Sequence, residues 1–139
     1  MNTKKLVLAI IVAYVVLMGS NFLIHSVWLM KDYQAIPTAW RPMDQMQQKI
    51  WIMWIGQLFF TILFAYIYTR GVEAKPWVAQ GIRYGILMTF FSVIPYSLSE
   101  YVVYRVPYML AVKWMIAGGI QLIVLGLIVA GIYKSPRAA

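Results

Sequence analysis

Cysteine is absent from this chain of 139 residues, which rules out disulfides, thiolate metal sites and thiol redox chemistry. Charge is scarce as well. Charged residues make up 12% of the chain, about half of the roughly 25% that is usual in soluble domains. A soluble fold of this size has to cover its surface with polar groups, and too few are present. The composition therefore argues against a water-soluble domain.

Acidic and imidazole side chains are almost missing, since the sequence holds four Asp and Glu residues and one histidine, His25. Three of the acids, Asp32, Asp44 and Glu73, fall at expected loop positions. One histidine cannot supply a paired-imidazole haem site, and no histidine–carboxylate spacing suggests a metal site. The sequence does not supply the residues of a nucleophilic triad or of a two-carboxylate hydrolytic site. We therefore predict no catalytic residues, no metal and no cofactor, while an enzymatic function stays open.

Long uncharged runs dominate what is present. They cover Leu6–Met30, Ile50–Thr69, Tyr84–Ser99 and Trp114–Tyr133. A bilayer core about 30 Å thick takes roughly 20 apolar residues as helix, and the third run reaches that length once it is extended at both ends. We predict an all-α fold, an antiparallel bundle of four transmembrane helices in one domain, 1–139. The expected spans are 6–30, 50–69, 77–103 and 108–133, the first of them too long for a cleaved secretory signal.

Basic residues and tryptophans indicate how the bundle lies in the membrane. Both termini are expected on one side, the cytoplasmic one, because seven Lys and Arg residues lie on that side against five on the other. The seven are Lys4, Lys5, Arg70, Lys75, Arg83, Lys134 and Arg137. Trp77 is expected on the inner side and the other tryptophans on the outer side. Four outer ones are predicted interface anchors, or alternatively a protein contact: Trp28, Trp51, Trp54 and Trp114.

Small residues recur at helix-packing spacing. Gly81 and Gly85 are four residues apart, and Gly119 and Gly126 line one stripe of the last span. Such stripes let helix backbones approach closely. The sequence leaves open whether the contact is within one chain or with a second copy. Pro95 lies deep in the third span, where a kink is expected.

Polar residues at membrane depth gather in the outer half of the predicted bundle. An ionisable group within a span is costly and is therefore a functional candidate. We expect one inward-facing cluster made of Asn21, His25, Gln57, Glu100 and Gln121. As a functional cluster it would line an outward-open cavity, in which His25 and Glu100 exchange protons or bind a polar ligand head. As a structural cluster, Glu100 would pair with Arg105 or Lys113, and His25 would bond a helix neighbour.

Four segments of the chain resemble a known group of proteins. They are HSVWLMKDY, AWRP, PWVAQGIRYGILM and AGGIQLIVLGLIVAGIYK, and together they cover most of the sequence. The layout resembles the small four-span bacterial inner-membrane proteins of unknown function, which implies the architecture and the location but no activity. Two better-known groups fit less well. Small multidrug-resistance transporters rely on a Glu in the first helix, and the membrane-associated eicosanoid and glutathione enzymes carry charged motifs in the second, which residues 51–70 lack.

Three functional hypotheses follow. The first is a non-enzymatic subunit or accessory factor of a larger membrane assembly, in contact with the lipid bilayer and with a membrane-protein partner or a second copy. The second is a ligand-binding or proton-coupled transport protein that uses the polar cluster. The third is a membrane enzyme acting on a lipid or quinone, with His25 as general base, which needs a passage from the bilayer to His25. The net charge of +8 sits at span ends, where anionic headgroups attract it, so no nucleic-acid partner is expected.

Overall fold

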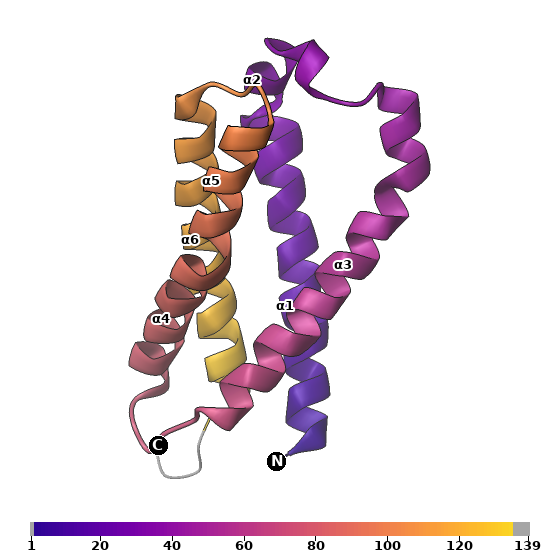
Figure 1. Ribbon diagram of the computed structural model, residues 1–139. Helices are drawn as coiled ribbons and strands as arrows, with labels where there is room; N and C mark the ends of the chain where they lie inside the picture. Colours follow the sequence, from indigo (N-terminus) through magenta and orange to yellow (C-terminus); the bar gives the residue numbers. More distant parts are fainter. Residues whose placement is uncertain (1, 135–139) are drawn as a thin grey trace.

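The computed structural model describes residues 2–134 as a bundle of helices, with no strand in that range (Figure 1). Four helical segments are long and apolar enough to cross a membrane. They are Thr3–Trp28, Met43–Arg70, Trp77–Val103 and Tyr108–Ile132. The predicted four-span helical fold is confirmed, and the chain is an integral membrane protein.

The described residues form six α-helices, of which α2 lies in the outer loop and the other five belong to the spans. Their bounds are α1 Thr3–Asn21, α2 Met30–Gln34, α3 Met43–Arg70, α4 Trp77–Met88, α5 Ile94–Val103 and α6 Tyr108–Ile132. Two π-helical segments, Phe22–Trp28 and Thr89–Val93, extend α1 and join α4 to α5. The second of them precedes Pro95, which lies in the first turn of α5. Proline has no N–H to donate to the preceding turn, and the wider π-helical turn accommodates this missing hydrogen bond.

Helix α3 begins at Met43, well before the apolar run that starts at Ile50. Residues 43–49 are mostly good helix formers, with neither Pro nor Gly among them. The helix therefore extends beyond the apolar run into a polar segment, which carries the charged residues Asp44 and Lys49. This extra length lets α3 reach farther on the outer side of the bundle.

Helices α4 and α6 pack most closely. A Cβ on Gly85 would lie 2.5 Å from Cα of Ile123, and one on Gly81 would lie 2.8 Å from the carbonyl oxygen of Gly126. Both distances are below any real Cβ contact, so only glycine allows this approach. The small-residue spacing therefore serves packing within one chain. Gly119 is less tightly placed, since its Cβ would meet a methyl group of the π-helical segment 89–93 at 3.3 Å.

The inner half of the bundle holds most of the core. Its buried residues come from α1, α3, α4 and α6: Leu6, Ala9, Ala13, Leu17, Phe64, Ala65, Tyr68, Met88, Leu122, Leu125, Val129 and Ala130. At this end the amide of Asn2 donates to the hydroxyl of Tyr133 over 2.8 Å. The start of α1 and the end of α6 therefore lie on the same side, as expected (Figure 1). Among the basic residues assigned to this side, Arg137 lies outside the described residues.

The inner loop between α3 and α4 is closed by polar contacts. The buried side chain of Gln80 accepts from the amide of Glu73 over 2.9 Å and donates to its carbonyl over 2.9 Å. The Glu73 carboxylate pairs with Lys75 at 2.5 Å and with Arg83 at 2.8 Å. The hydrogen bond from Lys75, followed by that from Arg83, holds the pKa of Glu73 below its ordinary value. Arg83 thus meets an acidic partner at the inner surface.

The outer half of α3 leaves the bundle. Its inner half buries Thr61, Phe64 and Ala65, whereas residues 43–59 are all exposed apart from the half-buried Gln57. Figure 1 shows the outer half of α3 leaning away from α5 and α6. The outer loop, with α2 and the 3-10 turn Pro37–Ala39, connects it back to the first span, and the hydroxyl of Tyr14 on α1 donates to the carbonyl of Trp54 over 3.2 Å. This divergence opens the space in which the polar residues lie.

Candidate ligand-binding cavity

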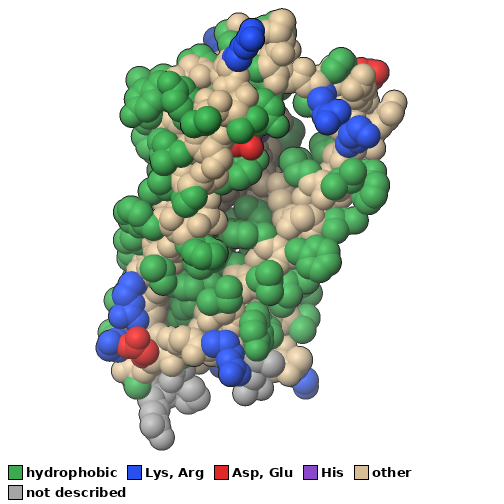
Figure 2. Space-filling view, in the orientation of Figure 1, with side chains coloured by type: hydrophobic (Ala, Val, Ile, Leu, Met, Phe, Trp, Pro, Cys, Tyr) green, Lys and Arg blue, Asp and Glu red, His purple; other side chains and the backbone are tan. Residues whose placement is uncertain are grey.

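A cavity of about 1200 Å³ lies between the outer half of α3 and the rest of the bundle. This volume exceeds the roughly 300–1,000 Å³ that is usual for small-molecule pockets. Figure 2 shows it as a hollow that opens on the side of the molecule between hydrophobic side chains. The lining includes all five residues of the predicted polar cluster: Asn21, His25, Gln57, Glu100 and Gln121. The divergence of α3 thus brings residues from four helical segments to one space.

The wall on the α3 side is apolar apart from Gln57. Met43, Met46, Met53 and Phe60 all line the cavity from this helix. Methionine side chains are flexible and polarisable, and they adapt to irregular apolar partners. All four residues lie within the membrane-spanning segment Met43–Arg70.

At its deep end, the cavity is closed by an amide bridge between α1 and α6. The Gln121 amide nitrogen donates to Oγ of Ser20 over 2.6 Å and to Oδ1 of Asn21 over 2.9 Å. Ser20 in turn donates to the carbonyl of Val16. The bonds from Nε2 of Gln121 to Ser20 and Asn21 thus join the two helices at membrane depth.

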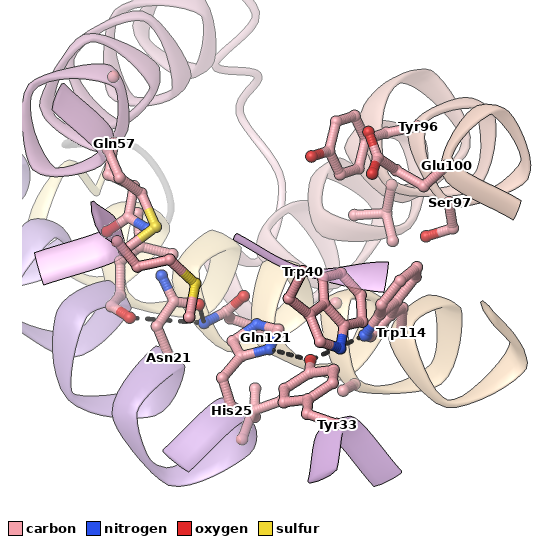
Figure 3. Close-up of a pocket in the computed structure, with 18 of the residues that line it drawn as sticks. Asn21, His25, Tyr33, Trp40, Gln57, Tyr96, Ser97, Glu100, Trp114 and Gln121 are labelled. Atoms are coloured by element: carbon pink, nitrogen blue, oxygen red, sulfur yellow. Dashed lines mark hydrogen bonds between the residues drawn. The ribbon is translucent and has the colours of Figure 1, made fainter. Parts of the chain in front are cut away.

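His25 belongs to a chain of three rings. Its Nδ1 lies 2.5 Å from the hydroxyl of Tyr33, and the indole nitrogen of Trp114 donates to that hydroxyl over 2.9 Å (Figure 3). An indole can only donate, so the Tyr33 oxygen accepts from Trp114. Among the described residues, Nδ1 of His25 is the one hydrogen-bonding partner that can accept the Tyr33 hydrogen, and we therefore assign the tautomer in which Tyr33 donates to Nδ1. The pKa of Tyr33 is raised, chiefly by burial, which keeps the hydroxyl protonated for this role. In a neutral imidazole the ring proton then sits on Nε2.

Two polar atoms in the cavity wall lack a hydrogen-bond partner within residues 2–134. They are Nε1 of Trp40 and Oε1 of Gln57, and both are buried. Leaving such a group unsatisfied costs about 1–3 kcal/mol. Trp40 is fixed in place by ring contacts with Tyr33 at 5.3 Å and with Trp114 at 6.3 Å. Both side chains line the cavity, so an occupant of this space would lie beside these two residues.

Glu100 is not held by a basic residue in the part of the chain that the structure describes. Lys113 instead binds both carboxylate oxygens of Asp32, at 2.8 and 2.9 Å. The expected structural pairing of Glu100 with Arg105 or Lys113 is therefore wrong, because α2 brings Asp32 to Lys113 first. Glu100 lies beside Tyr96, one turn earlier on α5 (Figure 3).

His25 and Glu100 stand on different walls of the cavity, on the first span and on α5, and no hydrogen bond joins them. Direct proton exchange between the two side chains therefore has no contact to use. The partner of His25 is Tyr33, which the sequence reasoning missed because it lies in the connecting segment. The run of Tyr33, Ile36 and Trp40 between polar residues was the available signal for a loop that folds back onto the bundle.

The tryptophans chosen as interface anchors divide into two groups. Trp28, Trp51 and Trp54 keep 44–55% of their surface exposed, as a lipid-facing ring would. Trp114 differs from the expectation, because its ring turns into the bundle, binds Tyr33 and lines the cavity. Its place on α6 faces the outer loop rather than the membrane, which the spacing from the span end did not reveal.

Among the described residues, no group of three or more His, Cys, Asp or Glu side chains is placed to hold a metal ion. The cavity instead offers hydrogen-bonding groups beside an apolar wall. They are the N–H groups of His25 and Trp40, the amide oxygen of Gln57 and the carboxylate of Glu100. Comparison with known proteins adds no assignment, since no family, no curated protein and no solved structure matches this chain.

Proposed function

We propose that this protein binds an amphipathic small molecule, taken up from the membrane through the opening beside α3. The main support for this proposal is the cavity of about 1200 Å³, which has an apolar mouth and holds the polar cluster inside. Ligand sites are mostly apolar with a few polar groups that fix orientation. The predicted orientation, with the termini in the cytoplasm of a bacterial inner membrane, would put the cavity in the outer half of the bilayer.

An accessory role in a larger membrane assembly is a second proposal. It is supported by the outer half of α3, which has no neighbour on most of its surface and exposes Trp51, Ile52 and Trp54. Tryptophan is favoured at protein interfaces as well as at lipid headgroups. The two proposals are compatible, because a partner that covers α3 would also cover the mouth of the cavity.

An enzyme acting on a lipid or quinone needs more than binding. The cavity provides the passage to His25 that such a role requires. However, Nδ1 is already occupied by Tyr33, and Nε2 carries the proton in the neutral ring. His25 is then set to donate rather than to act as a base, which makes binding the better-supported proposal.

Two glycines give a matched test of ligand binding. A Cβ on Gly56 or on Gly19 would meet nothing within 4 Å, and both residues are exposed, so neither backbone position is crowded. Only Gly56 lines the cavity. We expect Gly56→Trp to occupy the space and to remove a co-purifying amphiphile, whereas Gly19→Trp retains it. Native mass spectrometry of the protein extracted in mild detergent measures the bound mass.

The proposal fails if wild type, Gly56→Trp and Gly19→Trp all carry the same bound mass, or if none carries any and none takes up mixed membrane lipids on reconstitution. Helix content by circular dichroism is the folding control for both variants. Since replacing a helical glycine raises helix propensity by up to about 1 kcal/mol, neither substitution is expected to unfold the chain.

A further inference from the structure

The free N–H group of His25 bears on which polar head group a bound molecule can have. With Nδ1 accepting from Tyr33, the free ring atom is Nε2–H, which has no acceptor among residues 2–134. His25 is exposed and lines the cavity, so this N–H is presented to whatever fills the space. An occupant that displaces water from this N–H would have to offer an acceptor oxygen in its place.

The three-ring chain favours the neutral imidazole. A protonated His25 would donate from Nδ1 to the Tyr33 oxygen, which already accepts from Trp114. The Tyr33 hydrogen would then lose its acceptor. The geometry thus holds His25 as an uncharged donor and removes the cation that would attract an anionic head.

Charge in the rest of the cavity is balanced. The lining has one acidic side chain, Glu100, and one basic side chain, Arg41. Lys113 lies nearby but is already engaged by Asp32. Phosphate recognition uses clustered Arg or Lys side chains or the N-terminus of a helix. The lining includes the start of α3 at Met43, but with Arg41 as its one basic side chain it holds no basic cluster. The cavity suits a head without net charge.

The second donor lies beside the first. Trp40 contacts Tyr33 edge to face at 5.3 Å, and its unpaired Nε1 is in the same wall. A carbonyl oxygen has two lone pairs and can accept from two donors. The methionine-rich wall of α3 provides apolar contact for a tail that leads out to the bilayer.

We propose that the occupant is an uncharged amphiphile whose carbonyl oxygen accepts a hydrogen bond from Nε2–H of His25, with its apolar tail along α3. This inference rests on the proposed ligand-binding function. The chemistry is shared by two sources, a membrane quinone and a neutral acylglycerol. They differ in one respect, since only the acylglycerol has a hydroxyl that can donate to the unpaired oxygen of Gln57.

The test uses the full chain purified in mild detergent and three probes: a benzoquinone with a decyl tail, dioctanoylglycerol and dioctanoyl phosphatidic acid. Quinone binding is read from quenching of tryptophan fluorescence, because Trp40 and Trp114 line the cavity. The two lipids are measured as competitors of the quinone. Wild type is expected to bind the quinone, to exchange it for dioctanoylglycerol and to ignore phosphatidic acid.

Substitutions at His25 locate the head. We expect His25→Leu to raise the quinone Kd about five- to tenfold, the equivalent of one neutral hydrogen bond. His25→Gln keeps an N–H at a similar distance from the backbone and should stay within about threefold of wild type by the same arithmetic. If the natural ligand is an acylglycerol, Gln57→Leu should weaken the binding of dioctanoylglycerol alone. If it is a quinone, Gln57→Leu should weaken the binding of neither probe.

Three results overturn the inference: equal competition by phosphatidic acid, unchanged quinone affinity in His25→Leu, or no binding of either neutral probe. If the wild-type protein still carries a bound molecule that the Gly56→Trp variant lacks, the proposed function stands and only the proposed head group of the ligand is wrong. If no bound mass is found either, both fail together. Because His25 is exposed, its variants are expected to fold, and circular dichroism verifies this.

Discussion

Gly85→Val is expected to destabilise the bundle more than any other single substitution considered for this chain. Its side chain would enter the space where Cα of Ile123 lies 2.5 Å from an ideal Cβ. Backbone cannot rotate away as a side chain can, so α4 and α6 would have to separate. Overpacking typically costs about 1–3 kcal/mol and sometimes more, and we expect the upper end here. The measurement is the unfolding midpoint on titration with SDS in mixed micelles.

Gly56→Val is the matched control for that substitution. It is also a helical glycine in a membrane span, but an added Cβ meets nothing within 4 Å. Its midpoint should equal or exceed that of wild type, since leaving glycine favours the helix by up to about 1 kcal/mol. Equal midpoints for Gly85→Val and Gly56→Val would show that α4 and α6 do not pack as described.

Asp32→Asn is expected to loosen the outer loop and to lower stability by about 2 kcal/mol, within the range for hydrogen bonds to charged groups. The Asp32–Lys113 pair joins α2 to α6 across 2.8 Å, and both side chains keep only about a third of their surface exposed (32% and 30%). Breaking one half leaves the other charge with poor hydration. The neighbouring Tyr33–Trp114 bond should weaken as well, visible as a change in near-ultraviolet circular dichroism.

A double-mutant cycle with Lys113→Met separates the pair from its surroundings. If the two side chains interact as described, the double variant loses less than the sum of the single losses. Asp44→Asn is the control, because Asp44 is exposed at the start of α3 and forms no ion pair among the described residues. Strict additivity of Asp32→Asn and Lys113→Met would contradict the pairing.

For the polar cluster, the sequence predicted where the residues lie but not which side chains they contact. Depth along each span is a local property, so the outer-half position of Asn21, His25, Gln57, Glu100 and Gln121 was predictable, and all five line one cavity. Their partners were not predictable. Lys113 is bound by Asp32, 81 residues away, and His25 by a tyrosine in the following short helix. Which side chains meet depends on how α2 folds back, and no spacing encodes that.

The sequence alone determined that four segments are helices in a bilayer, because a run of about 20 residues without charge has to span it and a backbone in hydrocarbon has to satisfy its own hydrogen bonds. Only the tertiary structure decided where those helices part. Glycines draw α4 and α6 together, while α3 packs by its inner half and diverges by its outer half. Helix tilt is set by contacts between distant residues, so the cavity, unlike the spans, exists only once the chain is packed.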